Sequence, residues 1–114
     1  PFIPYTITKY GMSMLTLGLA EEFRDDNIAV NSLWPRTMIA TAAIEFEGGK
    51  ELLNNCRKPA IMADAAYEIL CSENGSLTGQ HLIDEDFLRE RGVSDFSIYS
   101  DVPDNQLGPD LYVD

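Results

Sequence analysis

The chain has 114 residues, enough for one domain of ordinary size, and its 45% of hydrophobic residues is too high a fraction for a disordered protein. Nineteen acidic against eight basic side chains give a formal net charge of −11, which disfavours binding to nucleic acid or to an anionic membrane surface. No apolar stretch approaches the ~20 residues that a membrane-spanning helix requires, so no membrane span is expected.

The first predicted elements are a long helix and a buried strand. Residues 4–26 are expected to form the helix, because Pro4 suits a first helical turn. Several residues recur there at a 3.6-residue spacing on one side: Tyr5, Lys9, Met12, Thr16, Leu19 and Phe23. The nearly continuous apolar stretch 28–34 is typical of a buried parallel strand.

Three further elements follow before a polar tail. Residues 37–49 are expected to run from a loop into a short helix that ends at its glycine pair, and residues 50–58 to add a helical turn or two. The stretch 59–75 begins with proline and has helical apolar spacing, which predicts another helix. Residues 79–84 are predicted to form a second short strand.

The order of these elements predicts an α/β fold. Parallel strands connected by helices form the right-handed crossover unit of this class. Two strands do not make a stable parallel sheet, because both faces and both edges need cover. We therefore expect the chain to be one end of a larger sheet. Residues 85–114 are rich in acidic side chains, and we interpret them as a solvated extension.

Tyr5 and Lys9 are the first candidates for chemistry. Residues four apart lie on nearly the same face of a helix, so both side chains can point into one cleft. A phenol has an ordinary pKa near ~10, and a nearby ammonium favours the phenolate. Such a pair can move a proton on or off a carbonyl or alcohol oxygen. The spacing alone is a weak signal, because it occurs often by chance.

Four other residues are interpreted as structural. Cys56 and Cys71 match neither a zinc motif nor a disulfide framework, so we expect reduced thiols and no metal site. His81 lies in the second predicted strand without Cys, His or paired carboxylates nearby. Trp34 ends the first predicted strand, which favours a place in the core over a substrate platform.

Three segments in order, YTITKYGMSMLTLGLAEEF, NIAVNSLWP and TGQHLID, together resemble the second half of a short-chain dehydrogenase/reductase. In that family a Tyr-x-x-x-Lys helix precedes a strand reading V-N-x-x-x-P, and T-G-Q leads into the last parallel strand. The stretches LWPRT, TAA and MADAAYEIL are similar to its hydroxysteroid dehydrogenase-like branch. The resemblance covers essentially the whole chain and implies the C-terminal part of a Rossmann-type doubly wound parallel sheet, with its last two strands and their helices.

The resemblance also implies a reaction: an alcohol and a carbonyl are interconverted, with NAD or NADP as the cofactor. Tyr5 would donate or accept the proton at the substrate oxygen. Lys9 would hydrogen-bond the nicotinamide ribose and keep Tyr5 acidic. Residues 1–84 would then carry the catalytic helix and the last two strands, and residues 85–114 the acidic C-terminal extension.

The segment after Pro35 would line the nicotinamide. Family members usually read P-G-x-[IV]-x-T there, whereas this chain reads PRTMIAT. Arg36 replaces the glycine, and Ile39 and Thr41 each fall one residue late. Either the loop carries one extra residue or Thr37 takes part of the role. Thr41 is equally well explained as the N-cap of the following helix.

The resemblance leaves parts of the enzyme unaccounted for. The family's glycine-rich turn, its N-N-A-G stretch and its catalytic serine should precede Tyr5, and the chain contains none of them. We therefore expect the C-terminal half of an enzyme, inactive alone. The alternative is a non-catalytic truncated member that acts through association. Small residues that could serve a helix contact, as in the family's dimers, are Gly11, Ser13, Gly18 and Ala20.

The substrate is expected to be a small apolar alcohol or carbonyl compound. Residues 37–58 would form the substrate lid, and Met38, Ile44 and Phe46 give it an apolar character. The choice between NAD and NADP stays open, because the discriminating residue belongs to the missing half. The compartment stays open too, with peroxisomes or mitochondria implied by relatives in the branch. A homo-oligomer is expected by the same resemblance.

Overall fold

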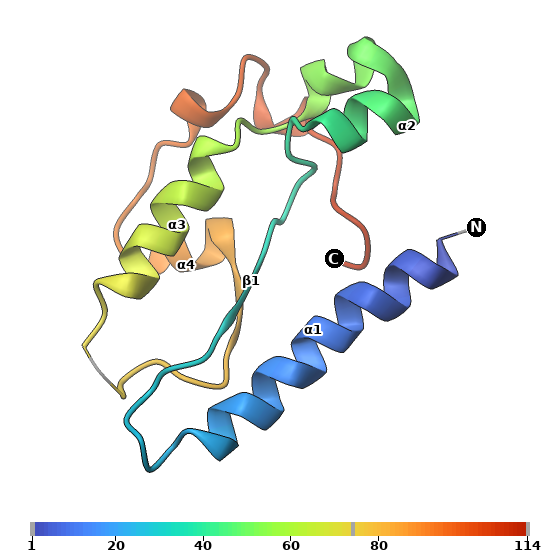
Figure 1. Cartoon of the computed structure of the whole chain (residues 1–114). Coiled ribbons are helices and arrows are strands. Elements are labelled where there is room, and N and C mark those ends of the chain that lie inside the picture. The colour runs from blue at the N-terminus through green and yellow to red at the C-terminus, as the bar shows by residue number, and fades with distance from the viewer. Residues whose placement is uncertain (1, 74, 114) are drawn as a thin grey trace.

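The computed structural model describes residues 2–73 and 75–113 and places helices on both sides of a two-stranded parallel sheet (Figure 1). The predicted α/β class is confirmed. The main elements are α1 (Ile3–Glu22), β1 (Ser32–Trp34), α2 (Ala42–Leu52), α3 (Ala60–Leu70), β2 (His81–Ile83) and α4 (Asp84–Glu90). Three short 3₁₀ turns are η1 (Leu53–Asn55), η2 (Ser97–Tyr99) and η3 (Asp104–Gln106).

The strands are shorter than predicted. Their register pairs Ser32 with His81 and Trp34 with Ile83, so only the last three residues of the predicted first strand join the ladder. The preceding residues still run beside the second strand. There Val30 N–H donates to the Thr78 hydroxyl at 3.1 Å, and Val30 O accepts the Gly79 N–H at 2.7 Å, so a side-chain bond adds to the backbone contact.

The helices differ from the prediction mainly at their ends. α1 ends at Glu22, four residues early, and a turn follows it. α2 continues to Leu52, but Gly49 has φ +78° and ψ 174°, so the expected break lies inside it as a kink. α3 ends at Leu70, five residues before the predicted end. Asn74, in the predicted end of that helix, lies outside the described residues.

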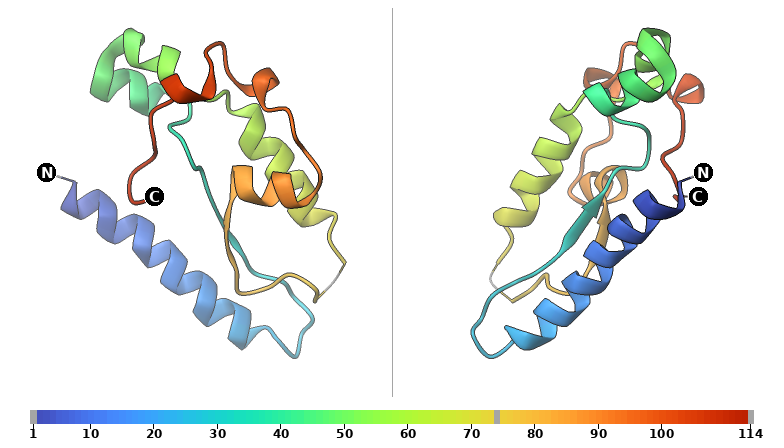
Figure 2. Two further views of the ribbon diagram at one scale, coloured as in Figure 1. Left: turned by 180° about the vertical axis from the view of Figure 1, so that it is seen from behind. Right: turned by 45° about the vertical axis from the view of Figure 1, so that its right-hand side comes forward.

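The core lies between the sheet, α3 and the chain that follows β2. Its buried members are Ile61, Ala65, Leu88, Phe96 and Tyr99. In the right-hand view of Figure 2, α3 covers one side of the strands and α1 the other. Most large side chains of α1 are exposed, among them Ile3, Ile7, Met14 and Leu17.

The interpretation of residues 85–114 as a solvated extension is wrong for a large part of this segment. Phe87, Leu88, Phe96 and Tyr99 are each no more than 4% exposed. The net negative charge of this segment is therefore a poor guide to its exposure. Its apolar residues pack on α3, and one of its acidic residues, Glu85, is itself buried against a cation.

That cation is Arg57, whose side chain is 1% exposed. Its Nε donates to Glu85 Oε1 at 2.5 Å, and its other guanidinium nitrogens donate to Phe96 O at 3.3 Å and Asp104 Oδ1 at 3.2 Å. One buried guanidinium therefore joins the loop before α3 to α4 and to the chain after α4.

Asp84, the first residue of α4, is fully buried. Its Oδ1 accepts the backbone N–H groups of Arg36 at 2.8 Å and Glu85 at 2.7 Å, while Oδ2 has no hydrogen-bond partner among the described residues. Burial raises the pKa of the Asp84 carboxyl above its ordinary value, although these two N–H groups act in the opposite direction. The folded state thus holds this proton to higher pH than the unfolded state does.

We expect Asp84→Asn to increase the free energy of unfolding at pH 7 by about 1 kcal/mol, because the amide keeps the acceptor oxygen and removes a buried, half-paired carboxylate. The stability contribution of Asp84 is fully present below its ordinary pKa of about 3.9 and is lost as pH rises through its raised folded pKa. The gain should therefore shrink toward pH 4. Chemical denaturation at both pH values measures it, with Asp26→Asn, at an exposed site, as the charge-matched control. A variant less stable than the parent at pH 7 would contradict the expectation.

Candidate active site

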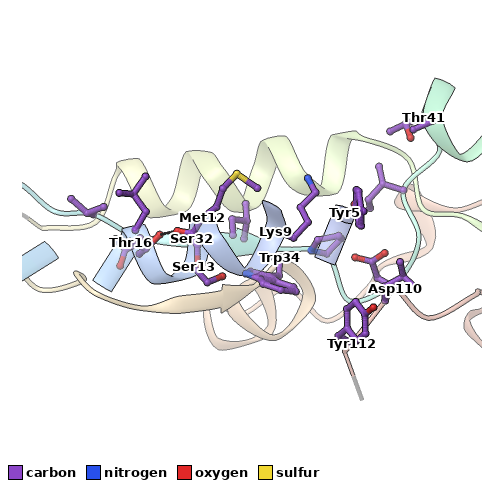
Figure 3. Close-up of a pocket in the computed structure, with 18 of the residues that line it drawn as sticks. Tyr5, Lys9, Met12, Ser13, Thr16, Ser32, Trp34, Thr41, Asp110 and Tyr112 are labelled. Atoms are coloured by element: carbon purple, nitrogen blue, oxygen red, sulfur yellow. Dashed lines mark hydrogen bonds between the residues drawn. The ribbon is translucent and has the colours of Figure 1, made fainter. Parts of the chain in front are cut away.

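A cavity of about 530 Å³ lies between α1, β1, the start of α2 and residues 110–112. Its volume is within the ~300–1,000 Å³ range of small-molecule pockets. Apolar side chains supply much of its wall, and they include Met12, Leu15, Leu19, Leu33 and Ile44. The side chains of α1 reach it from consecutive turns of the helix (Figure 3).

Tyr5 and Lys9 both line this cavity, as the helical spacing predicts. Lys9 Nζ lies 5.2 Å from the centroid of the Tyr5 ring, within cation–π range. The Tyr5 side chain is half-exposed, so a small molecule can reach its hydroxyl. Met12, Thr16 and Leu19 of the same predicted face also line the cavity.

The loop after β1 contributes three of its four predicted residues. Pro35, Ile39 and Thr41 line the cavity, whereas Thr37 is not among the lining residues. The backbone of Thr37 forms an antiparallel bridge with Pro109, and its buried hydroxyl has no partner among the described residues. Thr41 is also the N-cap of α2, with its Oγ1 accepting from Ile44 N–H at 3.5 Å. Both interpretations of Thr41 are therefore compatible with the structure.

Arg36, which stands where the family has glycine, has a structural partner. Its Nε donates to Asp86 Oδ1 at 3.0 Å, and a second guanidinium nitrogen contacts Asp86 Oδ2. The hydrogen bond to Asp86 raises the pKa of Arg36. The side chain therefore attaches the loop to α4, outside the cavity.

Sequence reasoning missed the contribution of Asp110, Leu111 and Tyr112, which also line the cavity. Asp110 and Tyr112 lie near the Tyr5 end of α1 (Figure 3). The Tyr112 hydroxyl lies 2.6 Å from Thr6 Oγ1, and the Tyr112 ring packs edge-on against Tyr10 at 5.8 Å between centroids. The Pro/Gly/Asp-rich composition of this stretch indicated a solvated tail. No local pattern predicts these contacts, because their partners lie about a hundred residues away.

The four residues interpreted as structural from the sequence are His81, Trp34, Cys56 and Cys71. The His81 ring nitrogen Nδ1 lies 2.6 Å from Ser32 Oγ across the two strands, a structural partner. Trp34, expected in the core, is only half-buried and is not a member of the buried core cluster. It meets Tyr10 edge-on at 5.6 Å and lines the cavity. Cys56 and Cys71 are free thiols.

The residues expected to give the substrate lid its apolar character lie in different surroundings. Ile44 lines the cavity, whereas Phe46 is 88% exposed. Met38 lies beside Gly108: a Cβ added at Gly108 would meet the methyl group of the Met38 side chain. In the part of the chain that the structure describes, no group of three or more His, Cys, Asp or Glu side chains could hold a metal ion.

No protein-family model matches the chain. Over 110 residues, 96% of the chain, it is 54% identical to hydroxysteroid dehydrogenase-like protein 2 of Danio rerio and 53% identical to the protein of that name from Mus musculus. It superimposes with a TM-score of 0.85, over 98% of its length, on the crystal structure of a short chain dehydrogenase from Mycobacterium thermoresistibile, with 51% identity. The resemblance to short-chain dehydrogenases is confirmed.

The similarity to these dehydrogenases is partial on their side. The chain spans 26% of the Danio rerio protein, 22% of the Mus musculus protein and 40% of the solved Mycobacterium thermoresistibile chain. The larger part of each relative therefore lies outside the match. Among the described residues, none of the helices has the length and apolar character needed to cross a bilayer.

Proposed function

We propose that this chain supplies the proton-transfer part of an NAD(P)-dependent oxidoreductase that interconverts an alcohol and a carbonyl. The observation that carries the proposal is the projection of Tyr5 and Lys9 from adjacent turns of α1 into one cavity. The similarity to short-chain dehydrogenases along nearly the whole chain supports the same assignment.

The residues of the cavity suit the nicotinamide end of such a cofactor. The Lys9 ammonium offers three hydrogen-bond donors to ribose hydroxyls, which accept them. Pro35, Ile39 and Thr41 line another part of the wall and would lie along the nicotinamide ring. No glycine-rich turn for a pyrophosphate is present in the printed sequence. The residues present therefore fit the nicotinamide and its ribose, but not the pyrophosphate.

Tyr5 would handle the proton of the reaction. In the reducing direction its hydroxyl donates the proton to the carbonyl oxygen, and in the oxidising direction its phenolate accepts the proton of the alcohol. The Lys9 ammonium lies 5.2 Å from the centroid of the Tyr5 ring, so a cation stands beside the group that would move the proton. The bound nicotinamide supplies or accepts the hydride at the substrate carbon.

We further propose that the chain is the C-terminal portion of a single dehydrogenase domain. In this proposal residues 1–84 contain the catalytic helix and the last two strands, and residues 85–114 the acidic C-terminal part. A parallel sheet of two strands is too small to be stable alone, and many large apolar side chains of α1 face solvent. Additional polypeptide would cover both and supply the glycine-rich turn and the serine. The intact mass of the purified protein tests this directly: a value well above 12.7 kDa is expected.

The proposed substrate is a small apolar alcohol or carbonyl compound, because apolar side chains dominate the wall around Tyr5. The proposed partners are this substrate, the nicotinamide cofactor and further copies of the protein. The alternative of a non-catalytic member that acts by association is supported by two of the four small residues expected at a helix contact: a Cβ added at Gly11 or Gly18 would meet nothing within 4 Å. The other two, Ser13 and Ala20, are buried within the chain.

Lys9→Met tests the cofactor assignment. We expect the dissociation constant for the nicotinamide dinucleotide to rise at least about tenfold, because charge-assisted hydrogen bonds contribute ~1.5–3 kcal/mol each. Fluorescence titration of the whole protein with NADH and NADPH measures the change. Lys50→Met, a substitution of the same type far along the kinked α2, is the control and should leave binding unchanged. Equal affinity for the dinucleotide in the Lys9 variant and the parent would refute the assignment.

A further inference from the structure

The C-terminal segment that lines the cavity is held in place at both of its ends. We call residues 108–113 the C-terminal strap. At its first end Gly108 N–H donates to Asn55 O, and Gly108 O accepts Met38 N–H, both at 2.9 Å. The backbone of Pro109 forms a bridge with Thr37.

The second end of the strap is held on α1 by Tyr112. Its hydroxyl lies 2.6 Å from Thr6 Oγ1, and its ring packs against Tyr10. Tyr112 has φ +65°, a left-handed backbone conformation that few non-glycine residues adopt, so the surrounding contacts hold the strap in this path.

Between these two ends, Asp110 is fixed with its side chain toward the cavity (Figure 3). Its backbone N–H donates to Arg36 O at 3.1 Å. Burial raises the pKa of the Asp110 carboxyl, while the backbone N–H of Leu111 and the charge of Lys9 act in the opposite direction. A partly desolvated carboxyl thus stands in the wall of the pocket that contains Tyr5.

Asp110 is one of two charged side chains among the described residues that line the cavity, and the other is Lys9. The elements packed around Asp110 add only tyrosines, Tyr5 on α1 and Tyr112 on the strap, as further titratable groups of the lining. In the proposed function Lys9 binds the cofactor ribose. The charge left to face the substrate is then that of Asp110.

We propose that Asp110 is a specificity-determining residue, which excludes substrates with an anionic group near the reacting carbon and admits neutral or cationic ones. This proposal rests on the proposed function, since it takes Lys9 as occupied by the cofactor. The physical reason is that two negative charges in a partly desolvated pocket repel each other far more than they do in water. The apolar part of the lining, which includes Leu111 and Ile44, offers an anionic group no hydrogen-bond donor.

A matched pair of probes tests the proposal: levulinate, a keto acid, and methyl levulinate, its neutral ester. We expect the whole protein with bound nicotinamide dinucleotide to bind the ester on the order of tenfold more tightly than the acid. Asp110→Asn should bring the two dissociation constants together, mainly by tightening that of levulinate. Asp26→Asn changes the net charge equally at an exposed site and should keep the difference. Isothermal titration calorimetry gives both constants without requiring turnover.

The outcomes separate this proposal from the proposed function. The same ester preference in the parent and in Asp110→Asn, or no binding of either probe, would overturn the role of Asp110. An Asp110-dependent preference in a protein that transfers no hydride to either probe would support the role and contradict the proposed function. Tyr112→Phe retains the carboxylate but releases the strap from Thr6, so a smaller preference in this variant would support the fixed placement of Asp110.

Discussion

Tyr5→Phe is expected to lower kcat by about 10²–10⁴-fold in the whole protein, while the dissociation constant for the nicotinamide dinucleotide stays unchanged. Phenylalanine keeps the ring that lies beside Lys9 and removes only the hydroxyl that would move the proton. Steady-state kinetics with a neutral ketone measure kcat, and fluorescence titration measures cofactor binding.

Tyr10→Phe is the matched control for this experiment. Tyr10 lies on the same helix, and its ring packs against Trp34 and Tyr112, but it is not a lining residue of the cavity. The same loss of a hydroxyl should therefore leave kcat unchanged. A Tyr5→Phe variant that turns over as fast as Tyr10→Phe would remove Tyr5 from the reaction.

Arg57→Met is expected to lower the free energy of unfolding by about 3–5 kcal/mol, because it leaves Glu85 as a buried charge without its principal partner. Phe96 O would also lose a donor, and Asp104 would lose its link to the core. The weaker contact of Glu85 with Arg89, at 3.4 Å, cannot replace the 2.5 Å bond. Urea denaturation measures the change from the midpoint and slope of unfolding.

Two variants make the interpretation of Arg57→Met specific. Lys58→Met removes the adjacent cation, whose partner Asp101 is largely exposed, and should cost only about 0.2–1 kcal/mol. The double variant Arg57→Met with Glu85→Leu removes both charges and should recover much of the lost stability. If Arg57→Met costs no more than Lys58→Met, the buried pair does not hold the chain after β2 to the core.

The cavity face of α1 was accessible to sequence reasoning because it depends on local periodicity. Tyr5, Lys9, Met12 and Thr16 share one face of any helix that contains them, and the structure places all four at the cavity. The parallel pairing of the two strands was also predicted, because helical segments separate them and parallel strands need such a crossover connection.

The other wall of the cavity was not predictable in this way. Asp110 and Tyr112 reach it through contacts with residues distant in sequence, and their local composition is typical of a solvated turn. Thr37 is excluded from the lining by its bridge to Pro109, a pairing with no signal in the loop itself. The burial of Glu85 likewise depends on Arg57, which is 28 residues away.

Isotope labelling shows whether hydride transfer takes place at the Tyr5–Lys9 cavity. The protein is incubated at its native length with NADH or NADPH deuterated at C4 and a panel of neutral apolar ketones, and the alcohol product is examined by mass spectrometry. We predict deuterium on the carbinol carbon in the parent protein, and none within the same time in Tyr5→Phe. A protein that binds the dinucleotide but transfers no deuterium to any ketone, or a Tyr5→Phe variant that transfers it at the parent rate, would contradict the account.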